Sequence, residues 1–309
     1  MACENPLTLR NPRYKKMTSK EVYLYSKEFF GEPVPPDLYI EVGCGQCHGC
    51  EKRRMRDYQI RLLYELNKHP NSYFITLTFD DKNLKRFEDA PNESLKLFLD
   101  RLRKECFNKQ VKHWFVAEYG TLHGRLHYHG FLFDLPYNNP TDVAHLILSK
   151  WQYGFTDAQK CDENASRYVT KYVTKSCNNG KKPPRIFSSV GIGTGYLDPD
   201  NIRFHNYGGI LRPYILYRGL KVPLPRYYHN KIFSDMDKIQ MLREREEMRC
   251  TEPLMWNGKA YYNLVDFNIV RRATFEKNVR LGLSKRYKSQ SNNKLNLSKH
   301  EFFKNSAGL

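Results

Sequence analysis

The chain has 309 residues and a formal net charge of +18, with a sequence pI near 9.5, which predicts a polyanionic partner such as nucleic acid or an anionic membrane. No apolar run approaches the ~20 residues of a membrane span, and the N-terminus lacks the apolar region of a secretory signal peptide. We therefore expect a soluble, intracellular protein that binds nucleic acid and no membrane. The 22 tyrosines suit a surface that stacks on unpaired bases, although any single tyrosine is more commonly a core or core-rim residue.

Residues 1–37 are polar and punctuated by prolines, which predicts an irregular N-terminal arm. A glycine-rich cysteine cluster follows, Cys44-Gly-Gln-Cys47-His-Gly-Cys50, and leads into a helix predicted over residues 51–67. Without a secretory signal, thiols at this spacing predict metal ligands rather than disulfides. The three cysteines are therefore candidate ligands of a structural Zn²⁺.

The fourth ligand of such a zinc site is left open by the sequence. His48 lies too close to the neighbouring cysteines to complete a tetrahedron comfortably. The fold would otherwise have to supply Cys106, Cys161 or Cys177.

The middle of the chain alternates between strand and helix patterns. Runs of β-branched and aromatic residues predict strands, and apolar residues at i, i+3, i+4 and i+7 predict helices. The expected order is strand 73–79, helix 95–106 behind the capping candidates Asn92 and Ser94, strand 113–119, strand 125–133, helix 141–150 and strand 153–159. This β-α-β-β-α-β order predicts an α+β protein with a ferredoxin-like split βαβ antiparallel sheet and helices on one face.

The later part of the chain is less regular. A helix is expected over residues 164–176, and residues 232–288 are expected to be helical, followed by a disordered tail from Ser289. The glycines of residues 188–195 predict a flexible turn rather than a phosphate-binding loop, because no Lys-Ser/Thr and helix follow. The expected domains are an N-terminal arm, cysteine knuckle and basic helix (1–69), a core with the 164–176 helix (70–230), and a basic helical extension with its tail (231–309).

A candidate metal site lies on two neighbouring strands. His127 and His129 share one strand face, because alternate residues of a strand point to the same side. Glu118 precedes His127 by nine residues across a short hairpin, so its carboxylate can complete a two-His, one-carboxylate site. His123 in the turn is a poorer candidate. The alternative is that both histidines are ordinary partly buried strand residues and the glutamate is a solvated charge.

Two tyrosines four residues apart stand out in the helix predicted over residues 164–176. Tyr168, Lys171, Tyr172 and Lys175 fall within one sector of the helix, while its valines form a second stripe suited to packing on the sheet. Lysine charges beside a phenol favour the phenolate, a stronger nucleophile. The lysines could equally hold a DNA backbone or protonate a leaving 3′-oxygen. The alternative is an ordinary amphipathic surface helix.

Taken together, these motifs resemble the HUH family of rolling-circle replication initiators. The resemblance rests on His127-Tyr128-His129, on the Thr- and aromatic-rich strand 74–79, and on the two-tyrosine motif of residues 168–175. Within the family, the chain is most similar to replication initiators of single-stranded DNA microviruses, particularly the gokushovirus-like branch. The cysteine stretch before a basic helix (44–54) and the Leu-Pro-Arg-Tyr-Tyr segment (224–228) carry that likeness, which spans roughly residues 40–230.

The resemblance implies an HUH endonuclease core with Mg²⁺ or Mn²⁺ on His127, His129 and Glu118. It implies tyrosine attack at the phage origin strand, a 5′-phosphotyrosyl intermediate with a free 3′-OH, and later rejoining of the displaced strand into a circle by the second tyrosine. No nucleotide cofactor is needed. The implied partners are single-stranded and origin DNA, a host helicase and a host DNA polymerase, in the cytoplasm of the infected bacterium.

Two alternative functions stay open at this point. Another HUH enzyme, a relaxase or transposase, is less consistent with the sequence, since relaxases usually carry a third histidine and an N-terminal tyrosine and transposases are usually smaller. A zinc-dependent, non-catalytic nucleic-acid-binding protein built on Cys44, Cys47 and Cys50 is the alternative from a different class.

Overall fold

A computed structural model describes residues 3–35, 38–87, 91–106, 111–120, 124–161, 186–217 and 219–284. The helix predicted over 164–176 and the tail from Ser289 lie outside these ranges. The chain divides into two compact units, which we call the terminal unit (residues 1–51 and 238–309) and the sheet unit (residues 52–237). The sequence-based division had placed the two ends of the chain in separate segments.

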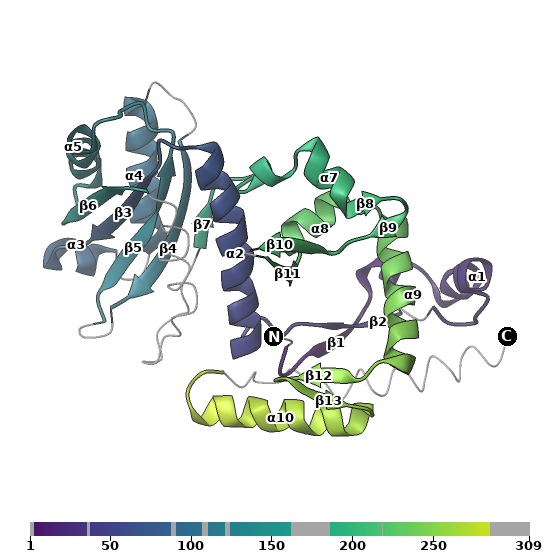
Figure 1. The fold of residues 1–309 in the computed structure, drawn as a ribbon. Coiled ribbons are helices and arrows are strands. Elements are labelled where there is room, and N and C mark those ends of the chain that lie inside the picture. The colour runs from purple at the N-terminus through teal and green to yellow at the C-terminus, as the bar shows by residue number, and fades with distance from the viewer. Residues whose placement is uncertain are drawn as a thin grey trace. The chain divides into compact units, whose positions relative to one another are not determined.

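The sheet unit is built on a five-stranded antiparallel sheet in the order β6-β3-β5-β4-β7 (Figure 1). Its strands and their helices are β3 (Tyr73–Thr78), α3 (Asp81–Arg86), α4 (Pro91–Glu105), β4 (Lys112–Tyr119), β5 (Leu126–Phe133), α5 (Pro140–Trp151), β6 (Thr156–Lys160) and β7 (Ile186–Ser188). The predicted α+β class is confirmed, as are the predicted strands and the two long helices of this stretch. The short helix α3 and the fifth strand were not predicted.

The caps predicted for the helix over residues 95–106, which is α4 in the structure, were wrong. The helix begins at Pro91, so Asn92 and Ser94 lie inside its first turn. Ser94 is buried, and its hydroxyl lies 3.3 Å from the hydroxyl of Tyr128 in the core. A serine caps a helix only if it precedes the first turn. Here the first helical residue is Pro91, a position that suits proline because the N–H it lacks would have no partner within the helix.

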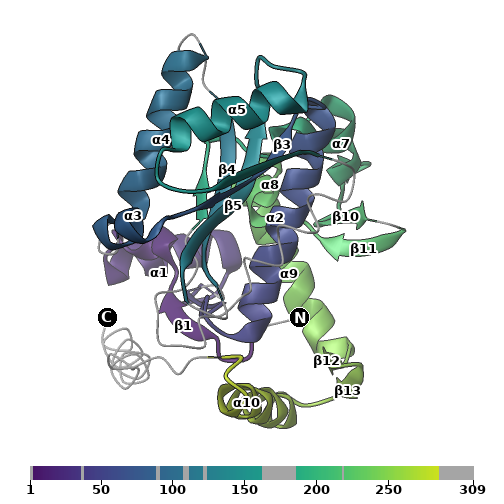
Figure 2. The same cartoon turned by 90° about the vertical axis from the view of Figure 1, so that its left-hand side faces the viewer.

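The two faces of the sheet are covered by different helices. Helices α4 and α5 pack on one face through Leu95, Phe98, Val143 and Trp151, which form one large apolar core with the strands (Figure 2). On the other face, Leu62 of α2 (His48–Lys68) packs over aromatic residues near one end of the strands. The other end of that second face holds the candidate metal ligands.

Gly130 lets two strands approach at the middle of the sheet. It pairs directly with Phe115, and a Cβ at this position would collide with the Trp114 carbonyl oxygen and the Phe115 ring. A side chain here would have to displace backbone, so the residue after His129 is restricted to glycine by packing.

The rest of the sheet unit consists of short elements that follow β7 in the chain. They are η3 (Thr194–Tyr196), α7 (Pro199–His205), β8 (Asn206–Tyr207), β9 (Ile210–Leu211), β10 (Tyr214–Tyr217), β11 (Leu220–Pro223) and α8 (Arg226–Ile232). The glycine-rich segment 188–195 forms the expected turn, but burial and hydrogen bonds hold this turn in place instead of leaving it flexible. Ile192 is fully buried, the Gly193 N–H donates to Glu65 Oε2 at 2.6 Å, and the Tyr228 hydroxyl donates to the Gly193 carbonyl at 2.7 Å.

The Glu65 carboxylate accepts hydrogen bonds from this turn and from strand β4. Replacement of Glu65 by Gln is expected to lower the free energy of unfolding of the sheet unit by roughly 1–3 kcal/mol. Its side chain is fully buried and also accepts from Lys112 Nζ at 2.6 Å. A Gln amide would turn a donor toward one of these donors. Glu105→Gln is the matched control, because its ion pair with Lys150 is exposed and such pairs contribute little. Urea unfolding of both variants checks the prediction, and equal midpoints would contradict it.

The terminal unit combines both ends of the chain. It contains β1 (Leu7–Arg10), η1 (Pro12–Tyr14), α1 (Ser19–Phe30), β2 (Tyr39–Val42), the start of α2, most of α9 (Asp235–Thr251), β12 (Leu254–Trp256), β13 (Lys259–Tyr261) and α10 (Leu264–Arg280). The expectation of an irregular arm over residues 1–37 was wrong. β1 pairs with β2, and α1 carries a capping box of Thr18 and Glu21 that the sequence reading overlooked.

The C-terminal region is helical as predicted, except for a hairpin. Strands β12 and β13 pair in antiparallel fashion around Asn257-Gly258, both of which have positive φ (49° and 80°). Asn-Gly at such a turn is a strong hairpin signal, so this element was predictable from the sequence. None of the described helices combines the length and apolar character needed to cross a membrane.

Candidate functional site

The candidate metal ligands of the sheet lie on one face, at the opposite end of the strands from Leu62 of α2. Glu118 on β4 pairs directly with His127 on β5, and His129 lies two residues along the same strand. The Glu118 side chain is buried, while both imidazoles are partly exposed. His129 Nε2 lies 3.7 Å from Glu118 Oε2, and the two imidazole rings lie almost parallel with centroids 6.3 Å apart. The predicted placement of these residues on neighbouring strands is confirmed.

The neighbouring strand β3 holds the His129 ring in place. The ring stacks on Phe74 with an interplanar angle of 5°, and its Nδ1 lies 3.2 Å from the hydroxyl oxygen of Thr76. Thr76 pairs with His129 in the sheet register, so this contact follows from the strand order. A hydrogen bond at Nδ1 selects the ring tautomer and so determines whether Nε2 keeps a lone pair.

The three side chains are not gathered tightly around one point. Among the described residues, the group of His, Cys, Asp or Glu whose ligand atoms all lie within 4.8 Å of one another consists of Cys3, Cys44, Cys47 and Cys50. The histidine pair and Glu118 have the donor types of a two-His, one-carboxylate site without that close convergence.

Tyr128, between the two histidines, belongs to the opposite face. It is fully buried among α4 and α5 residues, and burial raises the pKa of Tyr128 to about 12. A phenol in this environment is a poor nucleophile. The described strand residues on the histidine face include no tyrosine. A nucleophilic tyrosine would therefore have to come from another segment, and the predicted Tyr168, Lys171, Tyr172 and Lys175 lie outside the described residues.

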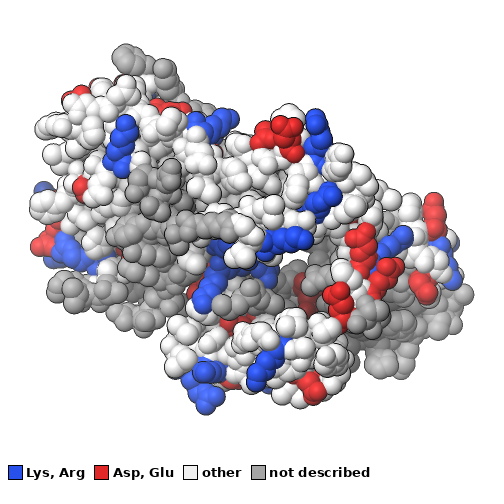
Figure 3. Space-filling view, viewed as in Figure 1, with Lys and Arg blue, Asp and Glu red and all other residues white. Residues whose placement is uncertain are grey.

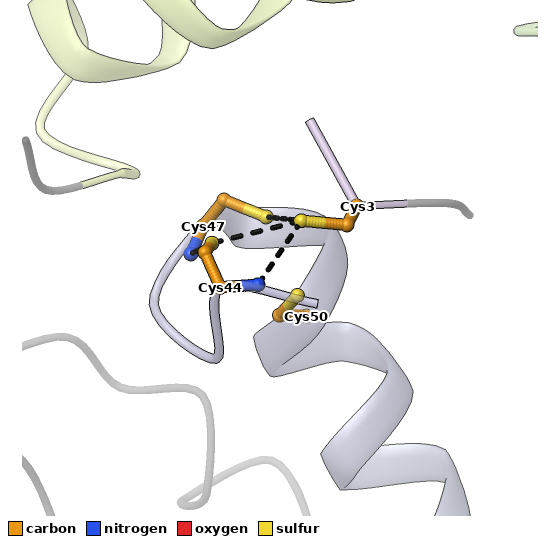
Figure 4. A group of neighbouring side chains, drawn as sticks. All are labelled: Cys3, Cys44, Cys47 and Cys50. Carbon is orange, nitrogen blue, oxygen red and sulfur yellow. Dashed lines mark hydrogen bonds between the residues drawn. The ribbon is translucent and has the colours of Figure 1, made fainter. Parts of the chain in front are cut away.

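The cysteine cluster is the second candidate site, and it includes a residue that the sequence reading missed. Cys3 lies beside Cys44, Cys47 and Cys50, with its Sγ 3.7 Å from the Sγ atoms of Cys44 and Cys47 (Figure 4). Hydrogen bonds among the four thiols lower the pKa of Cys44 and Cys47 and raise the pKa of Cys3 and Cys50, so in the absence of a metal the protons remain on the latter two. The cluster has the donor set of a metal site.

The cysteines considered earlier as fourth ligands lie elsewhere. Cys106 is buried in the apolar core beneath α4, and Cys161 packs beside the aromatic residues of the other sheet face. Both belong to the sheet unit, whereas the cluster belongs to the terminal unit. Cys177 lies outside the described residues. A lone cysteine at position 3 belongs to no local sequence motif, and only the fold places it beside the other three cysteines.

The comparison with known proteins agrees with the motifs. Residues 72–177 match the family of the replication-associated protein ORF2, a range that includes both the histidine pair and the two tyrosines. The chain is 26% identical over 285 residues to Replication-associated protein ORF2 of Spiroplasma virus 4, covering 80% of this chain and 86% of that relative. The chain resembles phage replication-associated proteins.

Two further relatives extend this similarity. Replication-associated protein ORF4 of Chlamydia phage 1 is 23% identical, covering 77% of this chain and 67% of the relative. Replication-associated protein VP4 of Bdellovibrio phage phiMH2K is 21% identical, covering 60% and 66%. No solved structure matches. The predicted resemblance to replication proteins of microvirus-type phages is therefore confirmed.

The described surface carries both signs of charge. On the face seen in Figure 3, Lys and Arg side chains are spread over several elements, while acidic side chains gather over the region of α9.

Proposed function

We propose that this protein is an HUH replication initiator, a site-specific single-strand DNA endonuclease that also rejoins the strand. The observation that carries the proposal is the meeting of His127, His129 and Glu118 on one sheet face, inside the segment that matches the replication-associated family. A relaxase or transposase is less favoured, because the relatives are named as phage replication proteins.

The strand order supports the HUH core. Numbered within the β-α-β-β-α-β stretch, the order β6-β3-β5-β4 is fourth, first, third, second, with every neighbouring pair antiparallel. This is the order of a ferredoxin-like split βαβ sheet with both helices on one face. The central strand β5 carries the histidines and β4, beside it, carries the carboxylate.

The donor set fits Mg²⁺ or Mn²⁺ held by His127, His129 and Glu118. Imidazole and carboxylate ligands on adjacent strands, open to one side, leave room for a phosphate oxygen. A cation bound there would withdraw charge from the phosphate under attack. The two imidazoles are partly exposed, so the proposed site lies at the surface, while the Glu118 carboxylate beside them is shielded from solvent.

The proposed chemistry is a transesterification. The phenolic oxygen of Tyr168 or Tyr172 attacks an origin phosphorus, the bond to the 3′-oxygen breaks, and that oxygen takes a proton and leaves as a 3′-OH. Lys171 and Lys175 favour the phenolate or supply that proton. The phosphotyrosyl bond is close in energy to a phosphodiester, so the second tyrosine can cut after one round and the circle can be closed without a nucleotide.

The proposed partners follow from this role. The net charge of +18 suits single-stranded and origin DNA. A host helicase and DNA polymerase would unwind and extend the strand in the cytoplasm of the infected bacterium. The cysteine cluster then has a structural role, which is developed below.

A covalent-adduct assay tests the proposal. The full chain is incubated with 5′- and 3′-labelled single-stranded oligonucleotides that tile the phage origin, with Mn²⁺, Mg²⁺ or EDTA. We expect an adduct that survives denaturation, carries the DNA by its 5′ end and forms only with the cation. Tight DNA binding without any adduct would favour the zinc-dependent, non-catalytic binding protein instead.

Thr76 offers a finer test of the histidine site. Thr76→Val removes the hydroxyl beside His129 Nδ1, and we expect the Mn²⁺ concentration needed for half-maximal cleavage to rise about 10–100-fold. Thr78→Val is the comparison variant, because Thr78 pairs with His127 in the same register but its hydroxyl donates to the Phe155 carbonyl. An unchanged Mn²⁺ dependence in Thr76→Val would show that the ring is oriented by other contacts.

A further inference from the structure

The four cysteines of the terminal unit have the spacing of a metal tetrahedron. With Zn–S bonds of about 2.3 Å, the edges of a regular tetrahedron of sulfurs are about 3.8 Å. Cys3 Sγ lies 3.7 Å from both Cys44 Sγ and Cys47 Sγ, well beyond the ~2.05 Å of a disulfide. We propose that Cys3, Cys44, Cys47 and Cys50 bind one Zn²⁺ in a structural site, with Cys3 as the fourth ligand.

Backbone amides around the cluster are arranged to stabilise thiolates. The N–H of Cys44 donates to Cys3 Sγ at 3.3 Å, that of Cys47 to Cys44 Sγ at 3.3 Å, and that of Glu4 to Cys47 Sγ at 3.4 Å. Helix α2 begins at His48, so the positive end of its dipole adds to this effect. Four thiolates and one Zn²⁺ carry a net charge of −2, which these donors offset.

The burial of the cluster distinguishes a structural from a catalytic site. Cys47 is fully buried, Cys3 and Cys50 are nearly so, and Phe275 and Val279 of α10 cover them. Four protein thiols leave no coordination position for water or substrate. The site is therefore a closed one.

The residue next to Cys3 shows what the site holds together. Glu4 is buried, and its carboxylate accepts hydrogen bonds from the Gly49 N–H, Asn278 Nδ2 and Ser284 Oγ at 2.9–3.1 Å. Ser284 Oγ in turn accepts from the His48 N–H at 3.0 Å. The N-terminus, the start of α2 and the end of α10 thus meet at one point. A zinc ion there fixes the first residues of the chain and, through Glu4, the C-terminal helix.

Metal analysis of the full chain, purified with a reductant and without chelators, tests the site directly. We expect one zinc per chain, released in step with modification of the cluster thiols by an organomercurial reagent. Iron in place of zinc, or no metal at all, would overturn the proposal. This measurement needs no nicking activity and no variant, so its failure is separate from that of the proposed function.

Cys3→Ser tests the fourth ligand. We expect its zinc affinity to fall by more than about 100-fold, because loss of even an outer hydrogen-bonding partner commonly costs about 10–100-fold. Hydrogen exchange at residues 44–51 and 275–284 should rise in the variant and in chelator-treated protein. Cys161→Ser is the matched control, and it should keep the full zinc content and protection. Wild-type zinc affinity in Cys3→Ser would show that another residue completes the site.

Discussion

Replacing both Tyr168 and Tyr172 by Phe is expected to abolish the covalent protein–DNA adduct, a loss of at least about 10³-fold in cleavage, while origin binding stays near the wild-type level. The substitution removes the phenolic oxygen that we propose attacks the phosphorus, and it keeps the aromatic ring. Phosphate contacts by Lys and Arg dominate affinity, and they are unchanged. Gel analysis of denatured reactions and a binding titration at fixed salt measure the two outcomes.

The single variants separate the two cuts. Cleavage of the first strand should survive in at least one of them, whereas release of a closed single-stranded circle should fail in both. Tyr172 is expected to act first, because Lys171 and Lys175 flank it on both sides in the sequence, whereas the nearest basic residues to Tyr168 in the sequence are Arg167 and Lys171.

Tyr207→Phe is the control for these variants, since that side chain is 66% exposed and loses only a solvated hydroxyl. A 5′-linked adduct in the double variant would show that the nucleophile lies elsewhere. If binding and adduct are both lost, circular dichroism and thermal unfolding distinguish misfolding from loss of the attacking group.

His127→Ala and His129→Ala are each expected to abolish cleavage and to leave DNA affinity largely intact. Each substitution removes one of the two proposed nitrogen ligands, and a cation held by fewer ligands would bind more weakly and polarise phosphate less. Glu118→Ala should bind the cation more weakly and cleave weakly, and it should recover in part at high Mn²⁺ because a higher concentration offsets a lower affinity. Cleavage rates across a Mn²⁺ titration separate the two behaviours.

The control for the histidine variants is His145→Ala. This residue lies exposed on α5, the helix that packs on the opposite face of the sheet. The substitution removes an imidazole without touching the proposed site. Full nicking by a His127, His129 double variant would end the interpretation of these residues as metal ligands.

The sequence by itself determined the features whose signals are local. The two faces of strand β5 were predictable residue by residue, with Leu126, Tyr128 and Leu132 on one face and His127, His129, Phe131 and Phe133 on the other. The hairpin between β4 and β5 is short, so the sequence alone indicated that Glu118 lies across from His127, and the strand register confirms this pairing. The Asn257-Gly258 turn and the Thr18 capping box also have local sequence signals, so both could have been predicted although they were not.

Tertiary structure alone decided what depends on residues far apart in the chain. Cys3 joins Cys44 across 41 positions, and no spacing rule connects a lone cysteine near the N-terminus to a distant triplet. Glu65 fastens Gly193 because α2 lies over one end of the sheet, a position that no helix pattern specifies. Periodicity shows which face of an element is buried, but the partner that buries it follows from chain topology. Long-range pairing therefore decided where the candidate ligands of both proposed sites lie.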